Sequence, residues 1–441
     1  MRKLIYFCVG LLVLGLLGGA SFWLIFGKGS EIAPVAAVDG AGFSQDQITL
    51  GAELVAVGDC VVCHTAKDGP PFAGGLALDT PFGVVYSTNI TPDPQTGIGT
   101  WSQAAFLRSM RQGLDRQGNH LFPVFPYDQY AKVTDSDLLA IYAFLSVQSP
   151  VVLAPKPTEL RFPFNLRPLM AIWKTLYLRE DVFKADPKLT DEQNRGAYLV
   201  TGLGHCASCH APRTLLGGID SARHFEGGLA EGWSVPAIGA ASHAAVPWSA
   251  TAYENYLFDG WDGAHGLAAG PMTAVINTLY DANEDDVAAM AAYMATLAPE
   301  PDPAGIAAQA EAASKHDWAE GEALGGANAP QEAALLHGEQ VFARNCITCH
   351  KARVSDAQPI SLGLSAVVND DSVGNFLRVL QEGIVPARAS RDRAMPAQAQ
   401  KLSAQEIADL AAFVRWRFTD LPAWSDTTRT VPSDAHQTGG G

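Results

Sequence analysis

A five-residue run of the form C-x-x-C-H occurs three times in this chain and constrains it more than any other feature. Its thiol pairs are Cys60 and Cys63, Cys206 and Cys209, and Cys346 and Cys349, and its histidines are His64, His210 and His350. Two thiols at this spacing can bond both vinyl groups of one porphyrin, and the histidine is then placed to ligate the iron. Six of the seven cysteines are used in this way. We therefore predict three covalently bound haem c groups.

Other uses of paired cysteines fit less well. A structural zinc takes four ligands, usually from two pairs close in sequence, whereas these pairs are roughly 140 residues apart. A thioredoxin-like redox motif needs neither the histidine nor three copies. The remaining cysteine, Cys8, lies in an apolar run and is interpreted as an apolar residue of that run.

A second signature follows each run, as expected of an internal repeat. It consists of Trp101-Ser102, Gly113 and Phe125 in the first unit, Trp248-Ser249, Gly260 and Met272 in the second, and Asp371-Ser372, Gly383 and Met395 in the third. The intervals between its members are the same in all three units. The serine is expected to cap a short helix and the glycine to end it, which leaves the last member in a loop over the haem.

The last member of this signature predicts the second axial ligand of each iron. Met272 and Met395 each adjoin a proline, which favours a stiff loop, and their thioethers would raise the haem potential. Phe125 cannot bind iron. The first haem is therefore either five-coordinate or ligated by another side chain, for which His120 in the same loop is the candidate.

The N-terminal segment predicts export. Arg2-Lys3 precedes an uncharged run from Leu4 to Phe26, which is long enough to span a bilayer and longer than the apolar region of most signal peptides. An uncleaved membrane anchor is favoured over a cleaved signal. Either places the haem domains on the periplasmic side, and an anchor would hold them at the inner membrane.

The predicted fold class is all-α, with three tandem haem domains behind an N-terminal transmembrane helix. In each unit a helix leads into the motif and an amphipathic helix closes the domain. The predicted divisions are 1–27 as anchor or signal segment, 43–150, 187–300 and 332–421 as haem domains, 151–186 as a connector with an amphipathic helix, and 301–331 as a solvated linker. The net charge of −16 argues against nucleic acid as a partner.

The chain resembles the membrane-bound three-haem cytochrome c subunits of bacterial periplasmic dehydrogenases. Its most specific stretches are 72–75, 80–83, 86–93, 96–99, 123–127, 202–205 and 212–213. The resemblance implies cytochrome c domains, a catalytic subunit that oxidises substrate, and ubiquinone or a terminal oxidase as acceptor. Phe125, where quinoprotein alcohol dehydrogenases usually have methionine, looks more like the cytochromes paired with molybdenum hydroxylases that oxidise aldehydes or N-heterocycles.

Three functions follow as hypotheses. The leading one is an electron-transfer subunit that is not an enzyme by itself, since the sequence shows no chemistry of a substrate pocket and two predicted six-coordinate haems leave no site for substrate on iron. The second is a haem enzyme that binds a small ligand at an open first haem. The third is a free-standing multihaem electron carrier.

Overall fold

The computed structural model describes residues 6, 27–38, 40–315, 317, 332–350 and 361–425. These residues form helices joined by loops, together with short antiparallel strands in small sheets. Within them, no helix combines the length and the apolar character that crossing a bilayer requires. The predicted anchor, including Cys8, lies outside the described residues apart from Tyr6.

The predicted fold class, all-α with an N-terminal transmembrane helix, is therefore corrected to a mainly helical fold with small sheets. The strands were missed because they are very short and follow the first two motifs in loops. For example, Ala77–Thr80 and Gly83–Tyr86 form a hairpin whose turn has Gly83 at φ 126°. Too few residues alternate there to reveal a strand from sequence alone.

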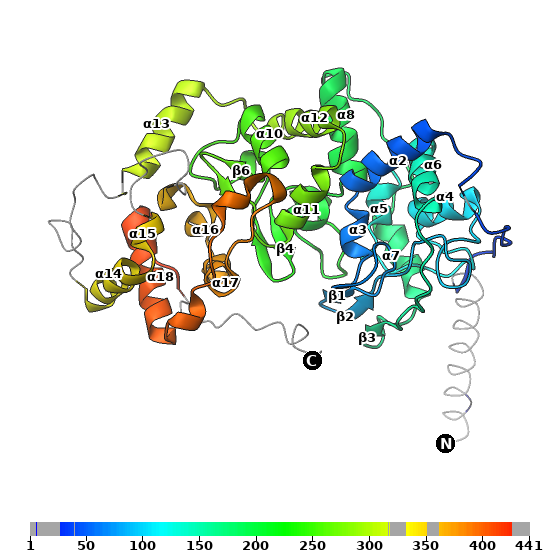
Figure 1. The fold of residues 1–441 in the computed structure, drawn as a ribbon, viewed down its shortest axis with the longest axis horizontal. Helices are drawn as coiled ribbons and strands as arrows, with labels where there is room; N and C mark the ends of the chain where they lie inside the picture. The colour runs from blue at the N-terminus through cyan, green and yellow to red at the C-terminus, as the bar shows by residue number, and fades with distance from the viewer. Residues whose placement is uncertain are drawn as a thin grey trace. The chain divides into compact units, whose positions relative to one another are not determined.

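The chain divides into two compact units (Figure 1). Unit 1 comprises residues 1–189, 197–208 and 213–219, and unit 2 comprises 190–196, 209–212 and 220–441. The domain boundaries predicted above are finer than this division and stay predictions. One difference concerns the segment 301–331, where part of the predicted linker forms a helix, Pro303–Ser314.

Unit 1 contains the first motif, which follows helix α2 along the chain. Its helices are α2 (Gln45–Val57), α3 (Cys60–Cys63), α4 (Gln103–Gln112), α5 (Tyr127–Tyr130), α6 (Asp135–Ser146), α7 (Leu169–Tyr177) and the π-helical turn Leu199–Leu203. Its sheet has the order β1 (Ala77–Thr80), β2 (Gly83–Tyr86), β3 (Glu159–Leu160). A reciprocal capping box of Ser44 and Gln47 starts α2, and Thr134 caps α6 by accepting from the Asp137 amide.

Unit 2 contains two further copies of the same plan. Its helices are α10 (Ala250–Asp259), α11 (Pro271–Leu279), α12 (Glu284–Ala295), α13 (Pro303–Ser314), α14 (Ala333–Asn345), α15 (Ile347–His350), α16 (Ala366–Asn369), α17 (Gly374–Glu382) and α18 (Ala404–Phe418). Its strands pair as β4 (Gly228–Ala230) with β5 (Trp233–Val235), and β6 (Trp261–Asp262) with β7 (Gly266–Leu267). The helices α8 (Asp191–Tyr198) and α9 (Ala207–His210) are divided between the units.

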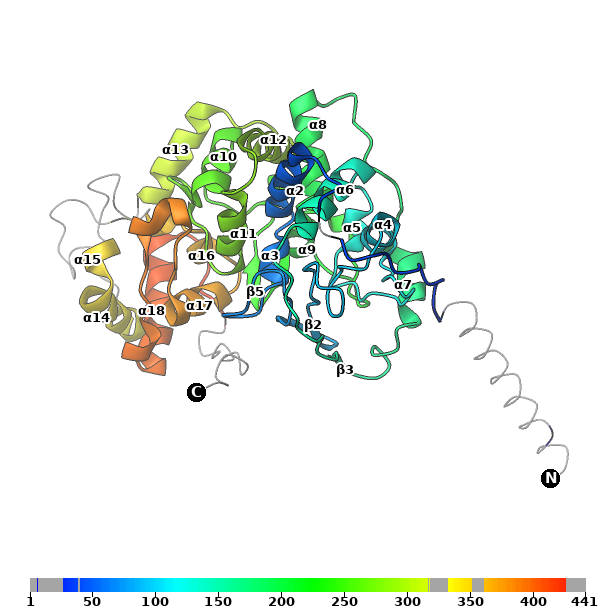
Figure 2. The ribbon, with the colours of Figure 1, turned by 45° about the vertical axis from the view of Figure 1, so that its right-hand side comes forward.

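A glycine lies at the closest approach of each leading helix to its closing helix. A Cβ on Gly51 of α2 would overlap the carbonyl oxygen of Ala140 in α6. Gly196 of α8 meets Ala289 of α12 in the same way, and Gly338 of α14 meets Asp409 of α18. Figures 1 and 2 both show α2 beside α6 and α14 beside α18. The repeat predicted from the motifs therefore extends to the helix crossings.

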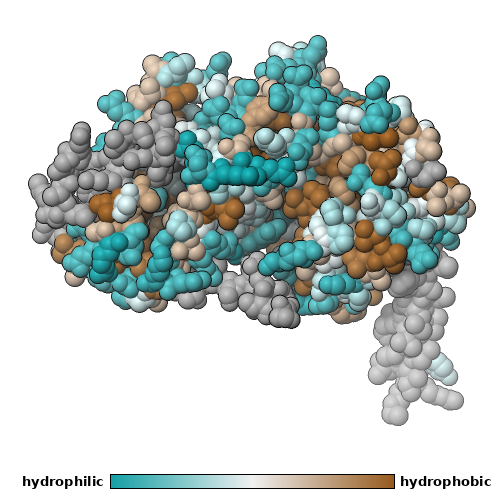
Figure 3. Space-filling model, viewed as in Figure 1, coloured by the Kyte–Doolittle hydropathy of each residue, from teal (hydrophilic) through white to brown (hydrophobic). Residues whose placement is uncertain are grey.

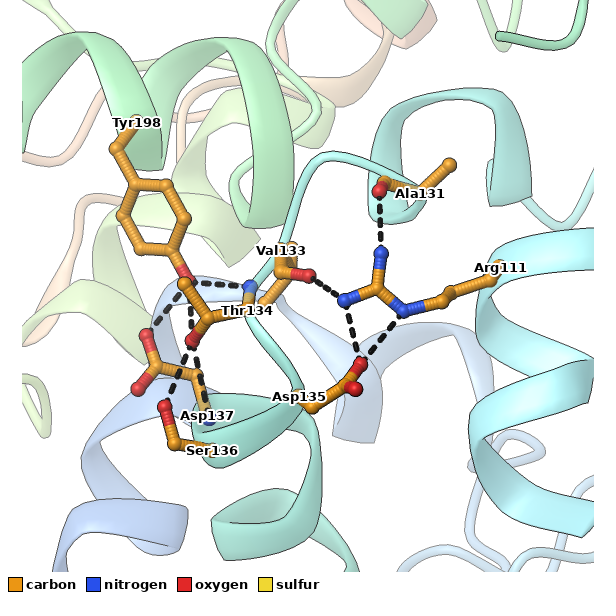
Figure 4. A network of polar contacts seen from close by, with 8 residues as sticks. All are labelled: Arg111, Ala131, Val133, Thr134, Asp135, Ser136, Asp137 and Tyr198. Carbon is orange, nitrogen blue, oxygen red and sulfur yellow. Dashed lines mark hydrogen bonds and ion pairs between the residues drawn. The ribbon is translucent and has the colours of Figure 1, made fainter. Parts of the chain in front are cut away.

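A polar network ties the start of α6 to its neighbours within unit 1 (Figure 4). The partly buried Arg111 guanidinium donates to the carbonyl oxygens of Ala131 (2.8 Å) and Val133, and pairs with Asp135 at 2.6 Å. The Tyr198 hydroxyl donates to Asp137 Oδ2 at 2.6 Å. These bonds satisfy carbonyls that the turn before α6 leaves without helical partners.

The predicted amphipathic helix of the connector is α7, and its apolar side is only partly buried. Met170 and Trp173 are buried, whereas Ile172 and Leu176 are exposed. Figure 3 shows apolar residues scattered among hydrophilic ones on the face in view. The predicted helix is therefore present, with Met170 and Trp173 in the protein interior and Leu176 on the surface.

Candidate functional site

The first thiol pair sits on a single helical turn. Asp59, with φ 52°, precedes α3, which begins at Cys60 and ends at Cys63. Burial, reinforced by the charges of Asp59 and Cys63, raises the pKa of Cys60 to about 12. Neither cysteine is in a disulfide. The helix thus holds the two thiols one turn apart, with Cys60 kept neutral by its raised pKa.

A backbone carbonyl fixes the ring of His64. Its Nδ1 lies 2.6 Å from the carbonyl oxygen of Thr88. A carbonyl only accepts, so Nδ1 carries the proton and Nε2 keeps its lone pair. Burial lowers the pKa of His64, which keeps the ring neutral. The ring is thus prepared to ligate a metal through Nε2.

The same device occurs at the second motif and has no described counterpart at the third. His210 Nδ1 lies 2.8 Å from the carbonyl oxygen of Pro236, and burial lowers its pKa. Burial also lowers the pKa of His350. Its Nδ1 is buried and has no hydrogen-bond partner among the residues that the structure describes. Residues 351–360, which follow it, lie outside them.

These donor sets fit haem c. Each motif presents two cysteines outside any disulfide next to a neutral, partly buried imidazole. At the first two motifs the ring tautomer is the one that leaves Nε2 for iron. When bound, the haem would supply one-electron redox chemistry.

The helix before each distal loop ends at the predicted glycine. Gly113 follows α4 at φ 56°, Gly260 follows α10 at φ 68°, and Gly383 follows α17 at φ 74°. Such positive φ values favour glycine. The predicted serine caps are confirmed for Ser102 and Ser249. In the third unit the residue before the helix is Val373 and not the predicted Ser372, so the helix begins one residue later than expected.

The two methionines lie in different local structures. Met272 is the second residue of α11, which starts at Pro271, so the expectation of a loop there is wrong. Met395 lies in an extended segment and exchanges backbone hydrogen bonds with Ile384 at 2.8 and 3.1 Å. Both side chains are partly buried. Their ligation of iron stays a prediction.

Backbone pairing shows that the equal sequence intervals hide two kinds of loop. The residue after each glycine pairs with a residue downstream, as Leu114 with His120, Trp261 with Leu267 and Ile384 with Met395. Met395 therefore occupies the paired position that His120 occupies in the first unit. Phe125 and Met272 instead come after the paired residue of their own units. The first two units thus share one loop arrangement, and the third has another.

Aromatic rings and a lysine occupy the distal side of the first unit. The ring centroids of Phe125 and Tyr130 are 5.3 Å apart. His120 is buried, and its Nδ1 lies 3.0 Å from Nζ of Lys174. Burial lowers the pKa of Lys174 to about 8. A charged Lys174 donates to Nδ1, which places the proton of a neutral His120 on Nε2 and works against iron ligation there. The assignment of His120 stays a prediction.

Sequence reasoning missed the groups that orient the proximal rings. Thr88 and Pro236 act through backbone carbonyls, which carry no residue-specific signal. The number of residues from the motif histidine to the accepting carbonyl is similar in the two units. This similarity is informative only once the hydrogen bonds are known.

Comparisons with known proteins agree with this geometry. A family model described as cytochrome c matches residues 335–417. The chain is 42% identical over 421 residues to a subunit of nicotinate dehydrogenase from Pseudomonas putida, covering 93% of this chain and 33% of that protein. It thus spans about a third of that relative's length.

Two further relatives are matched over most of their lengths. The gluconate 2-dehydrogenase cytochrome c subunit of Pantoea cypripedii is 32% identical over 402 residues, covering 87% of this chain and 88% of that protein. The cytochrome c subunit of the alcohol dehydrogenase (quinone) of Gluconobacter oxydans is 31% identical over 402 residues, covering 85% of this chain and 80% of that protein. The chain therefore belongs to the cytochrome c subunits of dehydrogenases, electron-transfer proteins with covalently bound haem c.

Proposed function

We propose that this chain carries three haem c groups and relays electrons from a catalytic dehydrogenase subunit to ubiquinone or a terminal oxidase. The observation that carries the proposal is the recurring site itself. A thiol pair precedes a partly buried, neutral histidine, and at two of three motifs a carbonyl holds that ring with Nε2 available. A low-spin haem shuttling between two oxidation states needs such fixed ligands.

The proposed partner is a hydroxylase that oxidises an N-heterocycle or an aldehyde. Two observations support this class over a quinoprotein partner. One is the 42% identity to a nicotinate dehydrogenase subunit. The other is Phe125, which stands where the second unit has Met272. We further propose that the haem domains work on the periplasmic side of the inner membrane, since haem is attached to such motifs outside the cytoplasm.

The test combines a mass measurement with reduction by substrate. The exported protein should exceed its polypeptide mass by three haems, and Cys209→Ala should lose one of them. A candidate hydroxylase and its N-heterocyclic substrate should then reduce the haems, which added ubiquinone analogue should reoxidise. A mass gain of two haems or fewer, or haems that stay oxidised with every dehydrogenase offered, would refute the proposal.

One observation favours a second function, ligand binding at the first haem. Phe125 stands at the position where the sequence interval predicts a sulfur ligand, and its ring contacts that of Tyr130. An iron left five-coordinate by that substitution would bind carbon monoxide after reduction. Turnover of a small oxidant such as peroxide by this haem alone would support an enzymatic role.

A further inference from the structure

The segment that leads into the second motif packs against the first motif within unit 1. His205 directly precedes Cys206, and its Nε2 lies 3.3 Å from the carbonyl oxygen of Gly58. Gly58 in turn lies just before the Cys60 thiol on the chain. Because a carbonyl only accepts, His205 donates this hydrogen bond. One side chain thereby links the entrances of the two motifs.

The missing side chain of Gly58 permits this approach. A Cβ built on Gly58 would lie 3.1 Å from Cδ1 of Leu203 and 3.3 Å from Sγ of Cys60. Both distances are tighter than ordinary van der Waals contact. Gly58 has φ −78°, so its backbone does not require glycine. A larger residue here would have to push Leu203 or Cys60 aside by a few tenths of an ångström.

Helix α5 and Lys132, two residues beyond its end, add two bonds between the same segments. The buried Gln129 donates from Nε2 to Oγ of Ser208, inside the second motif, at 2.6 Å. Lys132 donates from Nζ to the carbonyl oxygen of Thr201 at 2.8 Å. The segment from Thr201 to Ser208 is thus bonded to the first unit at three residues, Gly58, Gln129 and Lys132.

An aromatic contact completes this junction. The rings of Tyr130 and His205 meet edge to face with centroids 5.8 Å apart. Burial raises the pKa of Tyr130 well above its usual value, so its hydroxyl stays neutral beside His205. His205 adopts φ 38°, a strained conformation that persists only where its surroundings hold it.

We infer that His205 is a positioning residue that makes the first and second haems an adjacent, electron-sharing pair. This rests on the proposed function in requiring a haem at each motif. Thioether bonds tie each haem to its motif, so segments in direct contact bring the two porphyrins close. Electron exchange falls steeply with distance and is faster through packed atoms than through solvent. The hydrogen bond to Gly58 sets that separation.

The experiment compares His205→Leu with His205→Gln in the full-length holoprotein. Pulse radiolysis injects one electron per molecule and follows its redistribution by absorbance, and a redox titration gives the haem potentials. His205→Leu should lose the fast intramolecular phase. It should also raise two potentials, since apolar surroundings disfavour the more highly charged ferric haem. His205→Gln keeps a donor and should restore both readouts.

A matched control is His243→Leu, the same change at a side chain that is 73% exposed, and it should behave as the parent. Haem content by mass separates the outcomes, because fewer than three haems would undermine the proposed function rather than the junction. Parent-like kinetics and potentials in His205→Leu would overturn the inference. If that variant fails to take up haem, Gly58→Ala decides instead, and unchanged electron exchange in it would also overturn the inference.

Discussion

At each of the first two motifs one backbone carbonyl decides which nitrogen of the histidine would face a bound iron. Thr88 and Pro236 accept from Nδ1 at 2.6 and 2.8 Å. Such a bond orients the ring and raises the basicity of Nε2. Because the acceptor is main chain, the device survives substitution of either residue, so the histidines themselves and the distal ligands are the informative positions for mutation.

Replacing either methionine should lower the potential of one haem. Met272→Leu and Met395→Leu remove the sulfur and nearly keep the volume. A neutral thioether favours ferrous iron, so its loss should lower that potential and abolish the absorption band of a methionine–iron bond. Met290→Leu is the control, since Met290 is buried in α12. Parent spectra and potentials in both test variants would refute the ligand assignment.

Asp93 should contribute stability that disappears in acid. Hydrogen bonds from the Thr96 hydroxyl (2.7 Å) and amide (2.6 Å) lower its pKa below the usual 3.8. The unfolded chain then takes up the proton first as the pH falls. The contribution is therefore complete above pH 3.8 and is lost as the pH drops through the lowered value.

The measurement is the free energy of unfolding of the parent and of Asp93→Asn in denaturant. The difference between them should be largest near neutral pH and should shrink in acid. Asp79→Asn, at an exposed position of β1, is the control for the loss of a surface carboxylate. A constant difference between the parent and Asp93→Asn across this range would contradict the account.

At the scale of elements, the contact of a leading helix with its closing helix depends on one glycine. Gly51→Ala would place a methyl group against the carbonyl oxygen of Ala140. Alanine improves helix propensity by about 1 kcal/mol, but overpacking costs about 1–3 kcal/mol. We expect net destabilisation, seen as a lower thermal midpoint of the holoprotein.

The control for this prediction is Gly42→Ala. A Cβ at Gly42 meets nothing within 4 Å, so this change should be neutral or slightly stabilising. Equal midpoints for Gly51→Ala and Gly42→Ala would show that α2 and α6 can move apart without cost.

The sequence predicted those elements whose signals are local. The thiol pairs, the cap at Ser102 and the stop at Gly113 each depend on a few neighbouring residues. The remaining features depend on distant ones. Met272 starts a helix because Pro271 suits its first position, and Met395 pairs with Ile384 across a longer loop. An equal interval in sequence could not distinguish these two cases.

At the scale of the whole chain, one plan is used three times with a different distal side each time. Gly51, Gly196 and Gly338 mark the same helix contact in every copy. The segments that follow Gly113, Gly260 and Gly383 differ between the copies, and they carry the candidate ligands. A relay built from copies of one domain can thus have different potentials without changes to its scaffold.

The first haem should differ from the other two in binding carbon monoxide. Phe125 offers no ligand, and Lys174 holds Nδ1 of His120 at 3.0 Å, so the reduced protein should bind carbon monoxide at one of its haems only. Phe125→Met should suppress that binding and raise the potential, provided the loop brings the sulfur to the iron. Phe122→Met, a buried position in the same loop, is the control and should leave carbon monoxide binding intact. If His120 ligates the iron instead, the parent will bind no carbon monoxide, whereas the His120→Ala variant will bind it.

Magnetic circular dichroism of the oxidised protein separates these cases. Three histidine–methionine signals would show that another methionine reaches the first iron.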